Sequence, residues 1–109
     1  MTNVFLYQKN GRIQKIEIDG HSGFAEQGED IVCAAISILS FTAINAMLEM
    51  VDQKTPYVYE DGYLKVEIPS NLDEELFKKA LCILETIVIG LKSIEVQYDS
   101  YIRIKYKEV

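Results

Sequence analysis

The sequence predicts an α+β fold, in which one mostly antiparallel sheet with the element order ββαββαβ has two helices packed on its apolar face. Three observations lead to this prediction. Short β-rich runs come in pairs around tight-turn residues, two long segments have helical apolar character, and no strand–helix–strand unit repeats along the chain. With 109 residues the chain has the length of one domain, so we expect residues 1–109 to form a single domain.

The first twenty residues predict a β-hairpin. Residues 4–8 and 12–19 are β-rich, and the Asn10-Gly11 pair between them accepts the positive φ angles of a tight turn. Residues 20–28 follow with three glycines in nine positions and no apolar periodicity. They predict a mobile loop that closes over a bound molecule.

Residues 31–48 carry no formal charge and predict a helix that is buried on most of its circumference, against the sheet and either a second copy of the protein or a thick core within one chain. Asp30 is a suitable N-cap, and residues 51–53 mark the end of the helix. The segment has the minimum length of a membrane span. Its polar side chains and acidic flanks favour a core helix, so we expect no membrane contact.

The second half predicts another hairpin, a second helix and a final strand. Residues 57–59 and 63–68 flank the turn Glu60-Asp61-Gly62, and Pro69 ends the second of these strands. Ser70 and Asp73 form a capping pattern before a run with helical apolar spacing, which we expect to end near Gly90. Residues 94–107 alternate and predict a long strand with one wet face.

Charge and composition exclude several classes of function. Seventeen acidic and eleven basic residues leave a net charge of −6 that is spread along the chain. We expect no nucleic-acid surface, because phosphate neutralisation needs clustered Lys and Arg, and the acidic balance weakly favours a basic partner. One histidine and two distant cysteines cannot form a structural zinc site, so we expect no metal and no cofactor. Two cysteines and no charged leader favour the cytoplasm.

His21 and Cys33 are the residue types that could carry chemistry. Cys33 lies in the first turn of the expected helix, where free N–H groups and the helix dipole stabilise a thiolate. His21 on the preceding loop could take up the thiol proton and return it to a leaving amine. Asp30 and Ser37 share the helix face of Cys33, and Asp30 could orient the imidazole or cap the helix. The backbone N–H groups of Cys33 and Ala34 could form an oxyanion hole.

Each of these candidate residues also has an interpretation in which it serves the structure alone. A cysteine in an apolar helix usually packs in the core, a lone loop histidine is usually solvated, and a helical serine usually bonds back to a carbonyl. Cys82 illustrates the first case, because it lies between Leu81 and Ile83 with no histidine or helix end nearby. We expect Cys82 to serve packing alone.

The stretch Gly-His-Ser-Gly-Phe-Ala at 20–25, continued by Gly-Glu-Asp-Ile-Val-Cys-Ala-Ala-Ile-Ser at 28–37, closely resembles the signature of the ribosomal-processing cysteine protease family, Prp. The match covers about a fifth of the chain. The resemblance implies that His21 and Cys33 are the catalytic pair and that Asp30 and Ser37 support them. Ser22 and Ile36 depart from the commoner Ala and Val, and Ser22 thereby places a hydroxyl beside the expected base.

The resemblance also implies a function. The expected enzyme is a homodimeric cysteine endopeptidase that cuts a short N-terminal extension from a large-subunit ribosomal protein in bacteria. Its substrate loop would contain Gly20, Ser22, Gly23 and Gly28. The alternative is a non-catalytic small acidic interaction domain that binds a basic ribosomal partner, with His21 and Cys33 incidental.

Overall fold

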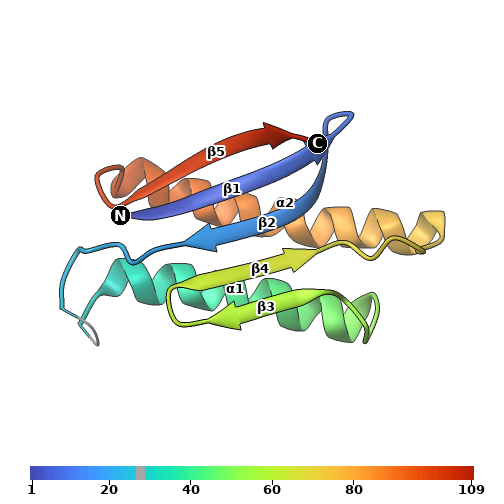
Figure 1. Cartoon of the computed structure of the whole chain (residues 1–109), viewed down its shortest axis with the longest axis horizontal. Coiled ribbons are helices and arrows are strands. Elements are labelled where there is room, and N and C mark those ends of the chain that lie inside the picture. The colour runs from blue at the N-terminus through green and yellow to red at the C-terminus, as the bar shows by residue number, and fades with distance from the viewer. Residues whose placement is uncertain (27–28) are drawn as a thin grey trace.

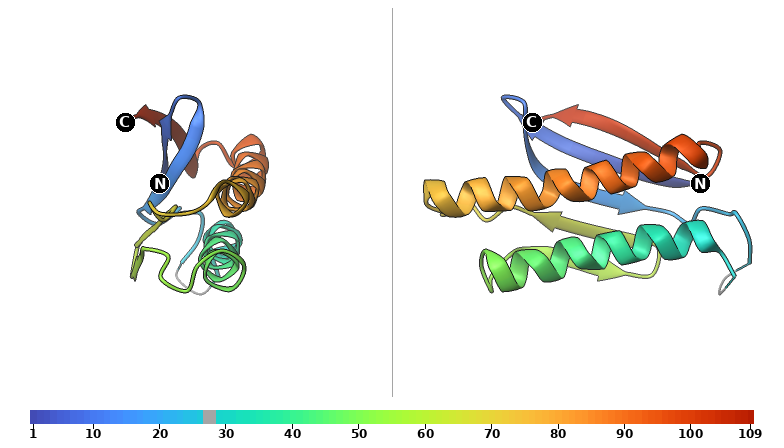
Figure 2. Two further views of the ribbon diagram at one scale, coloured as in Figure 1. Left: turned by 90° about the vertical axis from the view of Figure 1, so that its right-hand side faces the viewer. Right: turned by 180° about the vertical axis from the view of Figure 1, so that it is seen from behind.

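The computed structural model describes residues 1–26 and 29–109 and confirms the predicted α+β fold. Five strands form one sheet in the order β3-β4-β2-β1-β5, and both helices cover the same face of it (Figure 1; Figure 2). The elements are β1 (Thr2–Lys9), β2 (Arg12–Asp19), α1 (Ile31–Met50), β3 (Tyr57–Glu60), β4 (Tyr63–Glu67), α2 (Glu74–Gln97) and β5 (Ile102–Glu108). Within the described ranges, the other face of the sheet carries no helix.

The strands pair as the hairpin signals predict, with one parallel pair among those described. β1 pairs antiparallel with β2, β2 with β4, and β4 with β3, whereas β1 and β5 run parallel. A parallel neighbour requires a crossover, and α2 supplies it on the way from β4 to β5. Asn10 and Gly11 have φ angles of 54° and 75°, which confirms the tight turn between β1 and β2.

The core lies between the sheet and the helix layer. Alternate residues of the strands point toward the helices, as the two-residue period of a strand requires. The largest fully buried apolar side chains are Leu6, Ile16, Met47, Leu84, Leu91, Ile102, Val4, Val32 and Val66.

Helix α1 begins and ends where the sequence predicts, but it buries one face only. Asp30 caps it, and Val51 is its C-cap. Ile38 is 65% exposed on the outer side, so the expected burial around most of the circumference is wrong for a single chain. The sheet covers α1 on one side and α2 lies beside it, which leaves the outer side uncovered. By length and composition alone α1 could cross a membrane; in this fold its inner face packs on the sheet.

Helix α2 is longer than the sequence predicts. It is capped by Asp73, runs past Gly90 to Gln97, and the final strand begins at Ile102, so the expected strand over residues 94–107 is wrong in its first part. A Cβ on Gly90 would lie 3.0 Å from two methyl carbons of Leu39. Gly90 therefore permits the close approach of α1 and α2 and does not end the helix. Cys82 is exposed, so its expected role in packing is also wrong.

Candidate active site

His21 and Cys33 both line pockets at the N-terminal end of α1. Two adjoining pockets of about 220 and 300 Å³ are both lined by His21, Cys33 and Ser37. The first extends to the β3–β4 hairpin, and the second reaches Gly23 of the loop. The loop, the start of α1 and the β3–β4 turn lie at the same end of the molecule in Figure 1. The structure thus brings together the residues that the sequence singles out.

Asp30 ties the loop to the helix. Its Oδ1 accepts a hydrogen bond from the Cys33 N–H at 2.9 Å. Its Oδ2 accepts from the Ser22 hydroxyl and from the backbone N–H groups of Phe24 and Ala25, at 3.1 and 3.4 Å for the two N–H groups. Burial raises the pKa of Asp30, but these hydrogen bonds outweigh it and hold the pKa below the usual value. The carboxylate therefore caps the helix and organises the loop, and its described contacts do not include the imidazole.

Ser22 is part of the same arrangement. It is only 2% exposed, and its hydroxyl donates to Asp30 while accepting from the Phe24 N–H at 3.3 Å. The Phe24 ring packs edge-on against Tyr98 and Tyr101, with ring centroids 5.6 and 5.1 Å apart. Ser22 thus adds a hydrogen bond between the loop and the helix cap.

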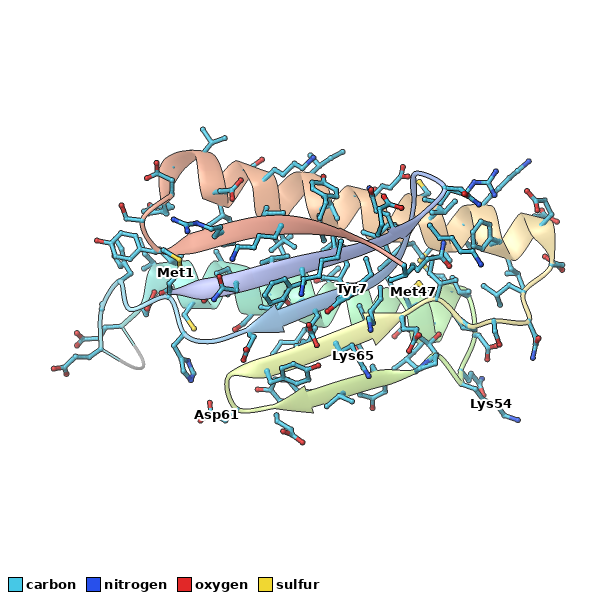
Figure 3. The ribbon with its side chains drawn as sticks, turned by 45° about the horizontal axis from the view of Figure 1, so that its top comes forward. Met1, Tyr7, Met47, Lys54, Asp61 and Lys65 are labelled. Carbon is cyan, nitrogen blue, oxygen red and sulfur yellow. The ribbon has the colours of Figure 1, made fainter. Side chains whose placement is uncertain are left out.

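The β3–β4 turn positions His21. The imidazole is 56% exposed, and its Nε2 lies 3.7 Å from Oδ1 of Asp61, whose position is labelled in Figure 3. A Cβ on Gly62 would lie 3.0 Å from Nε2, so the ring rests on this glycine. The Gly20 N–H donates to the Gly62 carbonyl at 2.8 Å. Gly20 has φ +97° and a Cβ there would lie 2.6 Å from the Met1 carbonyl oxygen, so this position requires glycine.

Sequence patterns do not reveal the contribution of Asp61 and Gly62 to the site. Their Glu-Asp-Gly segment is recognisable as a turn, but no local pattern says that this turn faces a histidine about forty residues earlier in the chain. The missing information is the order of strands in the sheet, which places β4 beside β2.

Ser37 lies one turn after Cys33 and lines both pockets with it. Ser40, further along the same helix, donates its hydroxyl to the Ile36 carbonyl at 2.6 Å, as is usual for a helical serine. The hydrogen bonds found among the described residues include no such bond from Ser37. Because Ser37 lines both pockets, a molecule bound there can contact this residue.

The expected oxyanion donors have partners in this structure. The Cys33 N–H is bonded to the Asp30 carboxylate, and the Ala34 N–H donates to the Asp30 backbone carbonyl at 3.0 Å. Neither N–H is free in this conformation. Gly28, expected in the substrate loop, lies outside the described residues. Within the described ranges, no cluster of three or more His, Cys, Asp or Glu side chains could hold a metal ion.

A family model described as "Cysteine protease Prp" matches residues 1–103 of the chain. The chain belongs to the cysteine protease Prp family. Two curated Prp proteins, each called a ribosomal processing cysteine protease, agree with this assignment. The protein of Bacillus subtilis (strain 168) is 35% identical over 94 residues, which is 84% of each chain. That of Staphylococcus aureus (strain Mu50) is 33% identical over 100 residues, which is 89% of this chain and 90% of the relative.

Solved structures share the fold over nearly the whole length. Prp from S. aureus with a covalently linked product peptide has a TM-score of 0.86 at 29% identity, and the match covers 98% of this chain and 100% of the other. The same protease with a substrate peptide has a TM-score of 0.80 at 28% identity, with the same coverage. A Streptococcus mutans protein has a TM-score of 0.80 at 25% identity and covers 100% of this chain and 96% of its own. As a Prp family member, the chain is a cysteine protease.

Proposed function

We propose that this Prp protein removes a short N-terminal extension from a protein of the large ribosomal subunit, with Cys33 and His21 as its catalytic dyad. One observation carries the proposal: the chain's only histidine and a cysteine in the first turn of α1 line the same two pockets. Two further facts support it. The relatives are called ribosomal processing proteases, and one solved relative holds a covalently linked product peptide.

The proposed reaction is acyl transfer through a thioester. The Cys33 thiol gives its proton to His21, and the thiolate attacks the carbonyl carbon of the scissile peptide bond. The C–N bond then breaks, and His21 protonates the departing amine. Water attacks the thioester, loses a proton to His21, and releases the carboxylic acid product together with the free thiol.

In this proposal Asp30 and Ser37 do not react themselves; they position the loop and the bound peptide. Asp30 holds the loop against the helix, and Ser37 offers its hydroxyl to the bound peptide from one turn below Cys33. For the N–H groups of Cys33 and Ala34 to hold the oxyanion, the Asp30 cap has to loosen. Closure of the loop over substrate would act on that cap directly, because Ser22 is bonded to the same carboxylate.

The pocket between α1 and the β3–β4 hairpin is the proposed binding site for the extension. Its walls include Ile36, Phe41 and Tyr59, and the rings of Phe41 and Tyr59 pack at 4.7 Å between centroids. Glu60 and Asp61 are exposed at its rim. An apolar pocket with an acidic rim suits an apolar segment next to basic residues, and ribosomal proteins are basic.

We further propose that the protein is a cytoplasmic homodimer. Ile38 of α1 and Ile89 of α2 are 65% and 67% exposed on the outer side of the helix layer. Exposed large aliphatic side chains on two neighbouring helices are typical of a protein interface. A second copy covering them would give α1 the burial that a single chain does not provide.

The decisive experiment follows the mass of the ribosomal protein. Wild-type protein, Cys33→Ala and Cys82→Ala are each incubated with the extended ribosomal protein, and the products are read by mass spectrometry. We expect cleavage by wild type and Cys82→Ala and none by Cys33→Ala. Cys82 is the matched control because it is the other free cysteine and is exposed on α2.

Loss of cleavage by Cys33→Ala identifies the nucleophile only if this variant remains folded. Removing one sulfur from a half-buried position should cost about 1 kcal/mol of unfolding free energy, so circular dichroism and the melting temperature of Cys33→Ala should stay near wild type. Cleavage by a folded Cys33→Ala would assign the nucleophile to another residue.

A further inference from the structure

The bare face of the sheet carries a group of cations that are far apart in the sequence. We define the basic strip by its members on three adjacent strands: Phe5, Tyr7, Lys15, Arg103, Lys105 and Lys107. Figure 1 looks onto this face, and the label of Tyr7 marks the strip in Figure 3. Four of the chain's eleven basic residues thus gather on one small surface, although the net charge is −6.

The strand register explains why the side chains of the basic strip lie together. In the parallel β1–β5 pair, Phe5 faces Lys105 and Tyr7 faces Lys107, while on the other side of β1 Tyr7 faces Lys15. The ammonium groups lie over the rings: Lys107 Nζ is 4.4 Å from the centroid of Phe5, and Lys15 Nζ is 4.1 Å from that of Tyr7. Two aromatic rings on β1 therefore lie beneath positively charged ammonium groups.

No acidic residue belongs to the strip. Two carboxylates on this face adjoin it: Glu67 faces Lys15 across the β2–β4 pair, and Glu17 faces Phe5 across the β1–β2 pair. Glu17 accepts hydrogen bonds from the hydroxyls of Tyr7 and Tyr63, and the Tyr63 bond is the main reason that the pKa of Glu17 is lowered. The charges of Lys15 and Lys107 also lower the pKa of Glu17, so this carboxylate offsets part of the positive charge there, whereas Arg103 and Lys105 are exposed on β5.

Protection of an open sheet edge explains only part of this arrangement. Lysines on an edge strand discourage pairing with other chains, and β5 is such a strand. However, Lys15 is on β2, in the interior of the sheet, and the outer N–H of Ile104 on β5 is already bonded to the Glu95 carboxylate at 2.7 Å. Edge protection therefore does not explain the lysine on an interior strand, and part of the β5 edge is already hydrogen-bonded. Binding of a ligand would explain why these cations are grouped.

We propose that the basic strip binds single-stranded RNA. Residues 103, 105 and 107 repeat every two positions, so their charges follow one another at about 6.6 Å along β5 and can track one phosphate backbone. A positive groove with aromatic rings on an open sheet is the arrangement that binds single strands in several RNA-binding folds. The choice of RNA among polyanions rests on the proposed ribosomal function.

The test is fluorescence anisotropy of a labelled twelve-nucleotide oligouridylate, titrated with the protein between 50 and 200 mM salt. Four neutralised phosphates on a single strand predict a slope of about −3 in the plot of log affinity against log salt concentration. We expect Lys105→Gln/Lys107→Gln to reduce the slope to about −1.4 and to weaken binding at 50 mM salt by about tenfold. The matched control is Lys78→Gln/Lys79→Gln, which removes two lysines on α2 and should bind like wild type.

Two further measurements keep the result decisive. Arg103→Gln removes a cation for which no ring contact is found in the described structure, so it should lower the slope by about 0.7 without disturbing the packing on Phe5. Cleavage of a short peptide substrate should be the same in every variant, which separates this proposal from the proposed protease function. Absence of RNA binding, equal binding by strip and control variants, or equally strong binding of polyglutamate or duplex RNA would each overturn the assignment.

Discussion

The Asp30 carboxylate joins the loop that carries His21 to the helix that carries Cys33. One oxygen accepts from the Cys33 N–H, and the other accepts from Ser22 and from the loop backbone. A single side chain therefore fixes the relative position of the two proposed catalytic residues. The charge matters as well as the shape, because an amide in its place cannot accept with both of its terminal atoms.

We expect Asp30→Asn to lower the unfolding free energy by about 1–2 kcal/mol and to lower turnover by tenfold or more. Asparagine still caps the helix, but its NH₂ group cannot accept from Ser22 and Phe24, so the loop is released. The matched control is Asp73→Asn at the cap of α2, where Oδ1 of Asp73 accepts from the Leu76 N–H at 2.9 Å far from His21. Thermal melts and peptide cleavage rates provide the measurement. Equal activity in the two variants would contradict the positioning role.

The same residue predicts a pH dependence of stability. Because the fold lowers the pKa of Asp30, its contribution is fully present above the unfolded-state pKa of about 3.9 and is lost as the pH falls through the lower folded-state value. The wild-type melting temperature should therefore fall more steeply below pH 4 than that of Asp30→Asn.

Among the elements, the β3–β4 hairpin has a role that its length would not suggest. Its strands are only four and five residues long, yet the turn between them supports the imidazole of His21. The support comes from the absence of a side chain at Gly62 and from the backbone hydrogen bond between Gly62 and Gly20. The hairpin thus shapes the first pocket in addition to contributing Leu64 and Val66 of β4 to the core.

Gly62→Ala should therefore damage activity more than stability. Both Gly62 and Gly11 have φ +75°, so alanine at either position costs about 1 kcal/mol in backbone strain. A Cβ at Gly11 meets nothing within 4 Å, whereas one at Gly62 meets the imidazole. We expect similar loss of melting temperature in both variants but a fall in the cleavage rate only for Gly62→Ala. Equal cleavage rates would show that His21 does not depend on this turn.

On the scale of the whole molecule, the two faces of the two-layer structure carry different surfaces. Figure 2 shows both helices on one side of the sheet. The outer side of this helix layer exposes aliphatic residues, and the side of the sheet that no helix covers carries the basic strip. The two pockets that His21 and Cys33 line open at one end, between the loop and the β3–β4 turn. Dimerisation through the helices would therefore leave the sheet face open.

The proposed dimer predicts a change of mass in solution. Ile38→Glu and Ile89→Glu each place a charge on the outer side of the helix layer, where burial against a second copy would be unfavourable. We expect both variants to sediment as monomers under conditions in which the wild type sediments as a dimer. Val109→Glu is the control, because Val109 is 66% exposed at the end of the chain, after β5. A monomeric wild type, or dimers in all three variants, would exclude this interface.

Much of the fold follows from the sequence where the signal is local. The Asn10-Gly11 turn, the Asp30 cap and the start of α1 depend on residues a few positions apart, and all three are confirmed. The element order and the fold class follow from the same kind of signal. The Prp signature at residues 20–37 is also local, and it suffices to assign His21 to the loop and Cys33 to the helix that follows it.

Tertiary structure decided everything that depends on which segments become neighbours. Gly90 fits against Leu39, Gly62 supports His21, and Lys105 lies over Phe5 only because the helices cross closely and the strands take the order β3-β4-β2-β1-β5. The exposure of Cys82 and of the outer face of α1 has the same origin, since an apolar helix has only as much covered surface as its neighbours provide. Local patterns are set by the backbone within one turn, whereas these contacts are set by strand order and register, which no short stretch of sequence contains.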